Sequence, residues 1–119
     1  MRIILTTENV FDAARLKDFI IKSIKGEFDG ITIDTWSYIK SSDKYDIIYH
    51  NLPQYKNDIT KNVLFRVEVD GINVILSSAW WSKNPEPSKD IISLHIGRLT
   101  EMLLIHFRNY YHRFSIIEF

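Results

Sequence analysis

Apolar and polar residues alternate most regularly over residues 62–81, where two runs rich in β-branched and aromatic side chains flank Asp70-Gly71. Asp-Gly between such runs is typical of a two-residue β-hairpin, and a type I′ turn here needs positive φ at both residues. This turn places Val69 opposite Ile72 and aligns the apolar residues of both runs on one face. We expect other elements to cover that face, because a single hairpin is not stable in water.

Two other stretches show the spacing of apolar residues that an amphipathic helix requires. The first covers residues 10–24, with Thr7 or Asn9 as its N-cap. The second begins after Ser88, a favourable N-cap, and continues to about His112. At ~1.5 Å per residue this second helix is ~37 Å long, which is enough to cross the whole sheet.

Short runs rich in β-branched and aromatic residues predict the remaining strands, at residues 2–6, 31–39, 45–51 and 113–119. In the 31–39 run the apolar face changes near Asp34, which indicates a bulge or a strand covered on both faces. Residues 52–61 predict the longest loop, with room for a turn of helix. The order β-α-β-β-β-β-α-β then predicts a single α+β domain over residues 1–119. Its simplest form is a two-layer sandwich, with a mostly antiparallel sheet and both helices packed on one face.

Composition narrows the class of protein. Apolar residues make up 45% and charged residues 25%, as in ordinary globular domains. The absence of cysteine excludes a disulfide scaffold, a thiol nucleophile and cysteine-type zinc sites. The net charge is zero, from 15 basic and 15 acidic residues, which weakens the case for a nucleic-acid binder. No run approaches the ~20 apolar residues of a membrane span and the start does not resemble a signal peptide, so we expect a cytoplasmic protein that does not bind membranes.

The histidines do not form a recognisable metal or catalytic site. His95 and His106 lie about three helical turns apart, too far for one metal ion. His95 falls in the apolar stripe of its helix, which predicts a hydrogen-bonded core histidine. His50 and Asp46, with a lysine and a C-terminal histidine, offer an alternative, a general acid–base pair for phosphodiester cleavage, but no Gly-rich phosphate loop or Gly-x-Ser-x-Gly elbow accompanies them. We therefore predict no enzyme, no catalytic residue, no metal ion and no cofactor.

The aromatic residues are the more informative feature of the chain. Several lie between Trp36 and Tyr55, interspersed with aspartates, and Trp80-Trp81 ends the hairpin. Since adjacent strand residues point to opposite faces, Trp80 belongs to the buried face and Trp81 to the other face, beside Leu64. An aromatic patch beside charged residues is typical of a protein–protein contact, unless a loop or a second protomer covers it. The predicted partner-binding residues are Trp36, Tyr38, Asp43, Tyr45, Asp46, Tyr49, Tyr55 and Trp81.

Three short stretches carry a resemblance: residues 35–38 (Thr-Trp-Ser-Tyr), residues 46–51 (Asp-Ile-Ile-Tyr-His-Asn) and Trp80-Trp81. With them, this small, neutral, cysteine-free α+β chain is similar to bacterial immunity proteins of polymorphic and contact-dependent toxin systems. The resemblance implies a non-enzymatic inhibitor that binds a cognate toxin and blocks its active site. It also implies that acidic and aromatic side chains meet a basic nuclease cleft, although the zero net charge departs from that picture.

Two other interpretations remain. The end of the second helix is locally basic and carries Arg108, Tyr110, His112 and Arg113, which suit an anion or nucleic-acid site in a small RNA binder or RNase. Cations also collect at helix C-termini without any ligand, because the last carbonyls carry partial negative charge. The remaining interpretation is a domain that self-associates as a homodimer through the face that carries Trp81.

Overall fold

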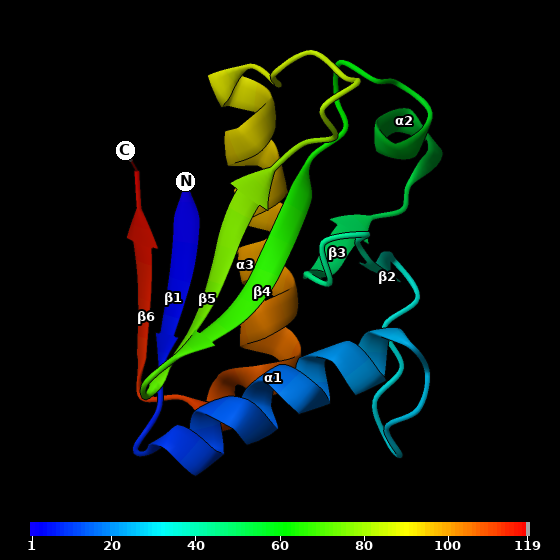
Figure 1. Ribbon diagram of the computed structural model, residues 1–119. Helices are drawn as coiled ribbons and strands as arrows, with labels where there is room; N and C mark the ends of the chain where they lie inside the picture. The colour runs from blue at the N-terminus through cyan, green and yellow to red at the C-terminus, as the bar shows by residue number, and fades with distance from the viewer. Residues whose placement is uncertain (119) are drawn as a thin grey trace.

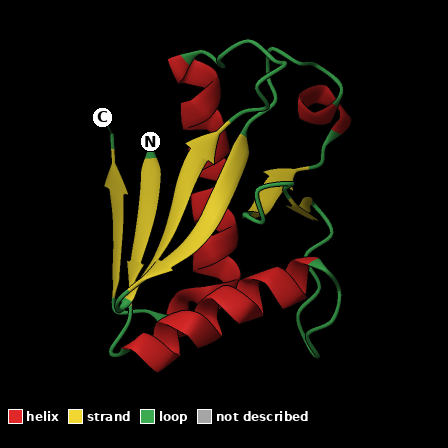
Figure 2. Cartoon of the chain, viewed as in Figure 1, coloured by secondary structure: helices red, strands yellow, loops and turns green. Residues whose placement is uncertain are grey.

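The computed structural model describes residues 1–118, and within them six strands form one sheet in the order β2-β3-β4-β5-β1-β6. Every pair of neighbouring strands is antiparallel. In chain order the elements are β1 (Arg2–Thr6), α1 (Val10–Ile24), β2 (Trp36–Lys40), β3 (Asp46–His50), α2 (Pro53–Lys56), β4 (Leu64–Asp70), β5 (Asn73–Ala79), α3 (Lys89–Phe107), a 3₁₀ turn (Arg108–Tyr110) and β6 (Arg113–Ile117). The α+β class and the order β-α-β-β-β-β-α-β are confirmed, with the short α2 inside the predicted long loop (Figure 2).

Both long helices pack on the same face of the sheet, which we call the inner face. In Figure 1, α3 runs behind the sheet along the strands, and α1 crosses their lower ends. One core cluster joins Phe65 and Leu76 of the hairpin to Leu16 of α1 and to Leu99 and Phe107 of α3, each at most 1% exposed. Burying a side chain of this size contributes ~1.5–3 kcal/mol relative to leaving it exposed. The predicted two-layer sandwich is therefore confirmed, and the opposite face, the outer face, receives neither α1 nor α3.

The hairpin of β4 and β5 has the predicted faces but not the predicted register. Val69 pairs with Val74 rather than with Ile72. Gly71 and Ile72 form the turn, and Gly71 takes φ +60° whereas Asp70 stays outside the left-handed region. This is the type II′ pattern, with glycine at the first central position, and it spares Asp70 the strain that a type I′ turn imposes on a residue with a side chain. A shift of two positions keeps every side chain on its own face, so the burial pattern survives the change of register.

The predicted strand over residues 31–39 is wrong in its first half. β2 begins only at Trp36. Residues 31–35 form a connection in which the Ile33 N–H donates to the Ser23 carbonyl at 3.3 Å, near the end of α1. The predicted change of apolar face therefore marks the passage from this connection into the strand and not a bulge within one strand.

Side-chain caps set where the two long helices begin. The Asn9 side chain accepts a hydrogen bond from the Asp12 N–H at 2.9 Å, so Asn9 and not Thr7 caps α1. Ser88 Oγ accepts from the Ile91 N–H at 3.2 Å, so the predicted cap of α3 is confirmed. Within residues 1–118 neither of these helices, nor α2, combines the length and apolar character that a membrane crossing requires.

The end of α3 differs from the prediction. The α-helix stops at Phe107, so it is ~28 Å long at ~1.5 Å per residue and does not reach His112. The His112 N–H instead donates to the Thr6 carbonyl at 2.8 Å, where β6 begins to pair with β1. The last strand is confirmed over Arg113–Ile117, and its predicted end at Phe119 lies outside the described residues.

Candidate functional site

The outer face of the sheet carries the candidate site, since neither long helix covers it. Strand alternation and pairing place Ile39 of β2, Ile47 and Tyr49 of β3, and Leu64 and Arg66 of β4 on this face. Leu64 and Ile47 are nevertheless almost fully buried, at 2% and 4% exposure. Side chains of neighbouring strands and loops therefore cover them, and the outer face has an apolar centre of its own.

A small hollow of about 160 Å³ opens at this apolar centre. We call it the outer hollow, and its lining residues are Ile39, Tyr49, Lys56, Asn62, Leu64 and Trp81. Trp81 thus lies beside Leu64, on the face where the sequence places it, although β5 itself ends at Ala79. Ile39 is 39% exposed, so the apolar lining of the hollow is accessible from outside. Asn62 donates its side-chain amide to the Tyr55 carbonyl at 3.3 Å, which ties this wall of the hollow to α2.

Positive charge flanks the outer hollow. The guanidinium carbon of Arg66 lies 4.3 Å from the centre of the Tyr45 ring, a distance at which cation and ring attract each other. Lys56 reaches the hollow from α2. Within residues 1–118 no carboxylate lines the hollow itself, although Glu68 follows Arg66 on the same face of β4. The outer hollow therefore combines aliphatic and aromatic side chains with the positive charge of Lys56 in its lining and of Arg66 beside it.

Trp80 does not enter the inner face, contrary to the prediction. β5 ends at Ala79, so strand alternation no longer directs the next side chain, and Trp80 is 38% exposed. It lines a shallow depression with Arg66, Glu68 and Ser77, whose side chains belong to the outer face. Both residues of the Trp-Trp pair therefore lie on or beside the outer face.

The structure divides the predicted partner-binding residues among three places. On the outer face or in the turn that leads to it lie Tyr45, Tyr49, Trp81 and the exposed Asp43. Trp36 and Tyr55 are only 3% and 5% exposed, so their side chains pack in the interior and cannot contact a partner. Tyr38 and Asp46 lie on the inner face, at the side of the sheet that α1 covers.

Three partners within the chain hold the carboxylate of Asp46. It accepts a hydrogen bond from the Tyr38 hydroxyl at 2.5 Å and lies 2.7 Å from Lys17 Nζ and 3.4 Å from Lys40 Nζ. Burial acts to raise the pKa of Asp46, but hydrogen bonds from Lys17 and Tyr38 outweigh it and lower that pKa below its usual value. Burial and the bond to this carboxylate in turn raise the pKa of Tyr38 to about 12. Asp46 therefore braces α1 against the sheet and is not free to meet a partner.

His50 belongs to a buried stack of rings. The ring centres are 5.2 Å apart for Trp36 and His50, 5.4 Å for His50 and Tyr55, and 4.6 Å for Tyr55 and His95. His95 Nε2 donates to the Lys61 carbonyl at 3.0 Å, which confirms the hydrogen-bonded core histidine. Burial lowers the pKa of His50 and of His95, so both rings favour the neutral form. Across residues 1–118 no three metal-ligating side chains gather closely enough to hold an ion.

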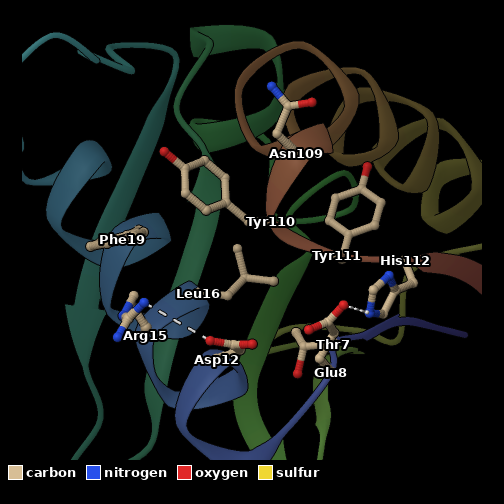
Figure 3. Close-up of a pocket in the computed structure, with 10 residues that line it drawn as sticks. All are labelled: Thr7, Glu8, Asp12, Arg15, Leu16, Phe19, Asn109, Tyr110, Tyr111 and His112. Carbon is tan, nitrogen blue, oxygen red and sulfur yellow. Dashed lines mark ion pairs between the residues drawn. The ribbon is translucent and has the colours of Figure 1, made fainter.

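A larger cleft, of about 470 Å³, lies between the start of α1 and the segment that follows α3 (Figure 3). Tyr110 and His112 of the alternative site line this cleft. Figure 3 shows His112 turned toward Glu8, with 3.3 Å between Nε2 and Oε1, and Arg15 turned toward Asp12, with 3.9 Å between Nη1 and Oδ1. Each basic side chain of the cleft therefore has an acidic neighbour.

The other two members of the alternative site lie elsewhere. Arg108 lines a separate hollow beside Leu104, and Arg113 is the exposed first residue of β6. The four residues do not form one basic surface. The carboxylates of Glu8 and Asp12 also disfavour a phosphate backbone in the cleft, because nucleic-acid affinity depends on an excess of positive charge.

Sequence reasoning missed part of the outer hollow. Ile39 pairs with Ile47 across β2 and β3, so a correct start for β2 would have placed it on the outer face. Lys56 and Asn62 reach the hollow from α2 and from the loop before β4. No local pattern indicates that a loop residue will meet a strand residue, so these two could not have been predicted.

Comparison with known proteins adds no assignment. The chain matches no protein-family model, no curated protein and no solved structure. Its function therefore has to be argued from the geometry of the outer face and from the chemistry of the residues there.

Proposed function

We propose that this chain is a non-enzymatic protein-binding domain of the immunity or antitoxin type, which binds a cognate toxin through the outer hollow and blocks it. The observation that carries the proposal is the hollow itself, an apolar depression with Tyr49 and Trp81 in its walls on the sheet face that neither long helix covers. Exposed apolar surface of this kind commonly marks an interaction site. Aromatic residues at such sites contribute much of the binding energy of an interface.

The charges around the hollow define the chemistry of the partner. We expect the partner to insert one apolar side chain against Tyr49 and Trp81 and to set carboxylates against Lys56 and Arg66. This differs from the acidic contact surface that the resemblance implies, because Asp46 is held inside the chain. The partner in this proposal is therefore a toxin with an acidic surface around its active site, and not a basic nuclease.

The inhibitory role rests on the resemblance of residues 35–38, residues 46–51 and Trp80-Trp81 to immunity proteins. The outer face is also physically suited to inhibition. Half of the residues that line the hollow, Ile39, Tyr49 and Leu64, lie on paired strands, and a preorganised surface loses little conformational entropy when it binds.

The first test captures the partner from a lysate of the organism that makes the chain. Three tagged baits are compared: wild type, Ile39→Asp and Phe11→Asp. The Ile39→Asp change adds a charge in the outer hollow, and Phe11→Asp makes the same kind of change on α1, at a side chain that is 77% exposed. We expect one stoichiometric partner protein to be retained by wild type and by Phe11→Asp, and to be lost from Ile39→Asp.

The second test expresses the captured protein in a bacterial host with and without the chain. A toxin slows growth of the host, and wild type or Phe11→Asp restores it while Ile39→Asp does not. A captured protein that is harmless to the host contradicts the role as a toxin inhibitor but leaves the binding face intact. Equal retention by all three baits contradicts the binding face.

A further inference from the structure

The outward side of α3 carries more apolar surface than a helix at a protein surface needs. The inward residues of α3 belong to the core, yet Leu94 is 43%, Leu104 44% and Ile105 67% exposed. A helix that is apolar on both sides is typical of one that is covered on both sides. Within residues 1–118 these three side chains remain 43–67% exposed, and Ile105 faces a hollow of about 370 Å³ that residues 32–36 also line, so cover for the exposed part has to come from another molecule.

Three charged residues on the same side of α3, and Arg108 directly after its end, form no salt bridge within residues 1–118. Asp90, Arg98, Glu101 and Arg108 are all exposed, and none of them forms an ion pair with any residue of the described chain. They recur at helical spacing together with the exposed apolar residues, so they lie in one stripe. Along the stripe the order is acidic, apolar, basic, acidic, apolar, basic. Two copies of this stripe are complementary when they run in opposite directions. Each acidic residue of one copy then meets a basic residue of the other, and each apolar residue meets an apolar one.

Gly97 lies near the middle of the same stripe, and no contact within the described chain requires glycine at this position. Glycine in a helix interior costs ~1 kcal/mol relative to alanine. A Cβ atom at Gly97 would meet nothing within 4 Å, so packing within the chain does not require glycine there. A glycine does allow a second helix to approach the backbone closely, which is what a helix crossing at this level needs.

We propose that a second copy of this chain packs on the outward side of α3, with the two helices antiparallel about a two-fold axis at the level of Leu99. Asp90 of one copy then faces Arg108 of the other. In the same register Arg98 of one copy faces Glu101 of the other. The midpoint in sequence of each of these two pairs falls at Leu99 or directly after it. Because the axis is two-fold, every contact occurs twice, which doubles the effect of each complementary pair.

The antiparallel arrangement is specific. A parallel arrangement in register sets Arg98 against Arg98 and Glu101 against Glu101, and facing like charges repel each other. In the antiparallel arrangement Leu94 packs against Ile105 of the second copy, so the apolar residues are removed from water at both ends of the contact. The charges therefore select the direction, and the apolar residues supply the affinity.

This contact does not depend on the proposed function. The outer hollow lies on the other face of the sheet, so a dimer through α3 leaves both hollows accessible. One helix stripe buries less than the ~1,200 Å² typical of stable complexes, so we expect a weak dimer with a dissociation constant in the micromolar range.

Sedimentation equilibrium of four proteins tests the proposal. The concentrations extend to ~1 mM, which is above the dissociation constant expected of a small interface. The four proteins are wild type, Arg98→Glu, Glu101→Arg and the double variant Arg98→Glu/Glu101→Arg. We expect the wild-type mass to rise from 14.1 kDa toward twice that value as concentration increases. Each single variant sets like charges against each other and weakens association by about tenfold or more, and the double variant restores it. Circular dichroism establishes that all four proteins fold alike.

Cross-linking tests the direction of the helices, and the absence of native cysteine makes it unambiguous. The double variant Leu94→Cys/Ile105→Cys should form a covalent dimer on mild oxidation, because the antiparallel register brings these two positions together. Leu94→Cys alone should not, because its two copies lie ~16 Å apart along the axis, beyond the reach of a disulfide. A wild-type mass of 14.1 kDa at every concentration overturns the proposal. Association that the single charge reversals leave unchanged, or a covalent dimer from Leu94→Cys alone, also overturns it.

Discussion

Lys17 Nζ lies 2.7 Å from Asp46 Oδ2, and this ion pair joins the middle of α1 to the first residue of β3. Both side chains are largely shielded from water, at 26% and 13% exposure. A shielded pair costs more to break than an exposed one, because the remaining charge keeps its desolvation penalty after losing its partner. The position of α1 on the sheet therefore depends on Asp46 as well as on the apolar core.

The substitution Asp46→Asn should lower the free energy of unfolding at neutral pH by ~1–3 kcal/mol, because it leaves Lys17 partly buried without a counter-charge. Urea denaturation measures this change. The matched control is Asp18→Asn, which removes an exposed pair with Lys22. We expect that control to change the free energy of unfolding by less than ~0.5 kcal/mol, since exposed i,i+4 pairs contribute little. Equal effects of the two substitutions would contradict the bracing role of Asp46.

Acid should remove the contribution of Asp46. The pKa of its carboxyl is lowered in the folded protein, so its stabilisation is complete above the unfolded value of ~3.9 and is lost as pH falls through the lower folded value. The difference in thermal midpoint between wild type and Asp46→Asn should therefore be constant from neutral pH down to about pH 4 and shrink below it. If the difference in thermal midpoint between the two proteins stays the same below pH 4, Asp46 does not stabilise the protein through its charge.

His95 should produce a separate loss of stability as pH falls, in a range nearer neutral pH than that of Asp46. Burial lowers the pKa of its ring, despite the opposing effect of the hydrogen bond to the Lys61 carbonyl. A lowered folded pKa means that the stabilisation is complete above the unfolded value of ~6.5 and falls as pH decreases below it. The free energy of unfolding should thus decrease between about pH 7 and pH 5. His95→Phe should make this decrease smaller but not abolish it, because the pKa of His50 is also lowered by burial. Urea denaturation at several pH values checks this, and identical slopes for both proteins would refute it.

The turn of the hairpin gives a prediction about backbone conformation. Gly71→Ala should destabilise the protein by ~1–2 kcal/mol, because φ at this position is +60°. A clash cannot explain such a loss, since a Cβ at Gly71 would meet nothing within 4 Å. Asp70→Ala should change the free energy of unfolding by less than ~0.5 kcal/mol. A type I′ turn, which the sequence predicts, would instead place Asp70 at positive φ, so two comparable losses would contradict the type II′ turn.

The hairpin also shows what a sequence pattern determines. An alternation with period two identifies which side chains share a face, and the faces of β3, β4 and β5 were predicted correctly from it. It does not distinguish registers that differ by two positions, and the turn geometry that decides between them depends on where Gly71 sits. The same alternation applies only within a strand, so it failed for Trp80, which follows the end of β5.

Only part of the candidate site was predicted, because a local sequence pattern does not report contacts between distant segments. Aromatic composition identified Tyr45, Tyr49 and Trp81, but it also selected Trp36 and Tyr55, which are buried. Whether such a ring is covered depends on contacts between distant segments. The ring stack that buries Tyr55 needs a residue of β3 and a residue of α3, and no local spacing reports their proximity.

Isothermal titration calorimetry tests most directly whether the outer hollow is the contact surface. It measures the affinity of the captured partner for wild type, Trp81→Ala and Phe11→Ala. Thermal unfolding of each variant first establishes that it is folded at the temperature of the titration. If the outer hollow is the contact surface, Trp81→Ala weakens binding by ~30-fold or more, as truncation of an aromatic anchor does, and Phe11→Ala binds like wild type. Equal affinity for all three proteins, or a loss confined to Phe11→Ala, would show that the partner binds elsewhere.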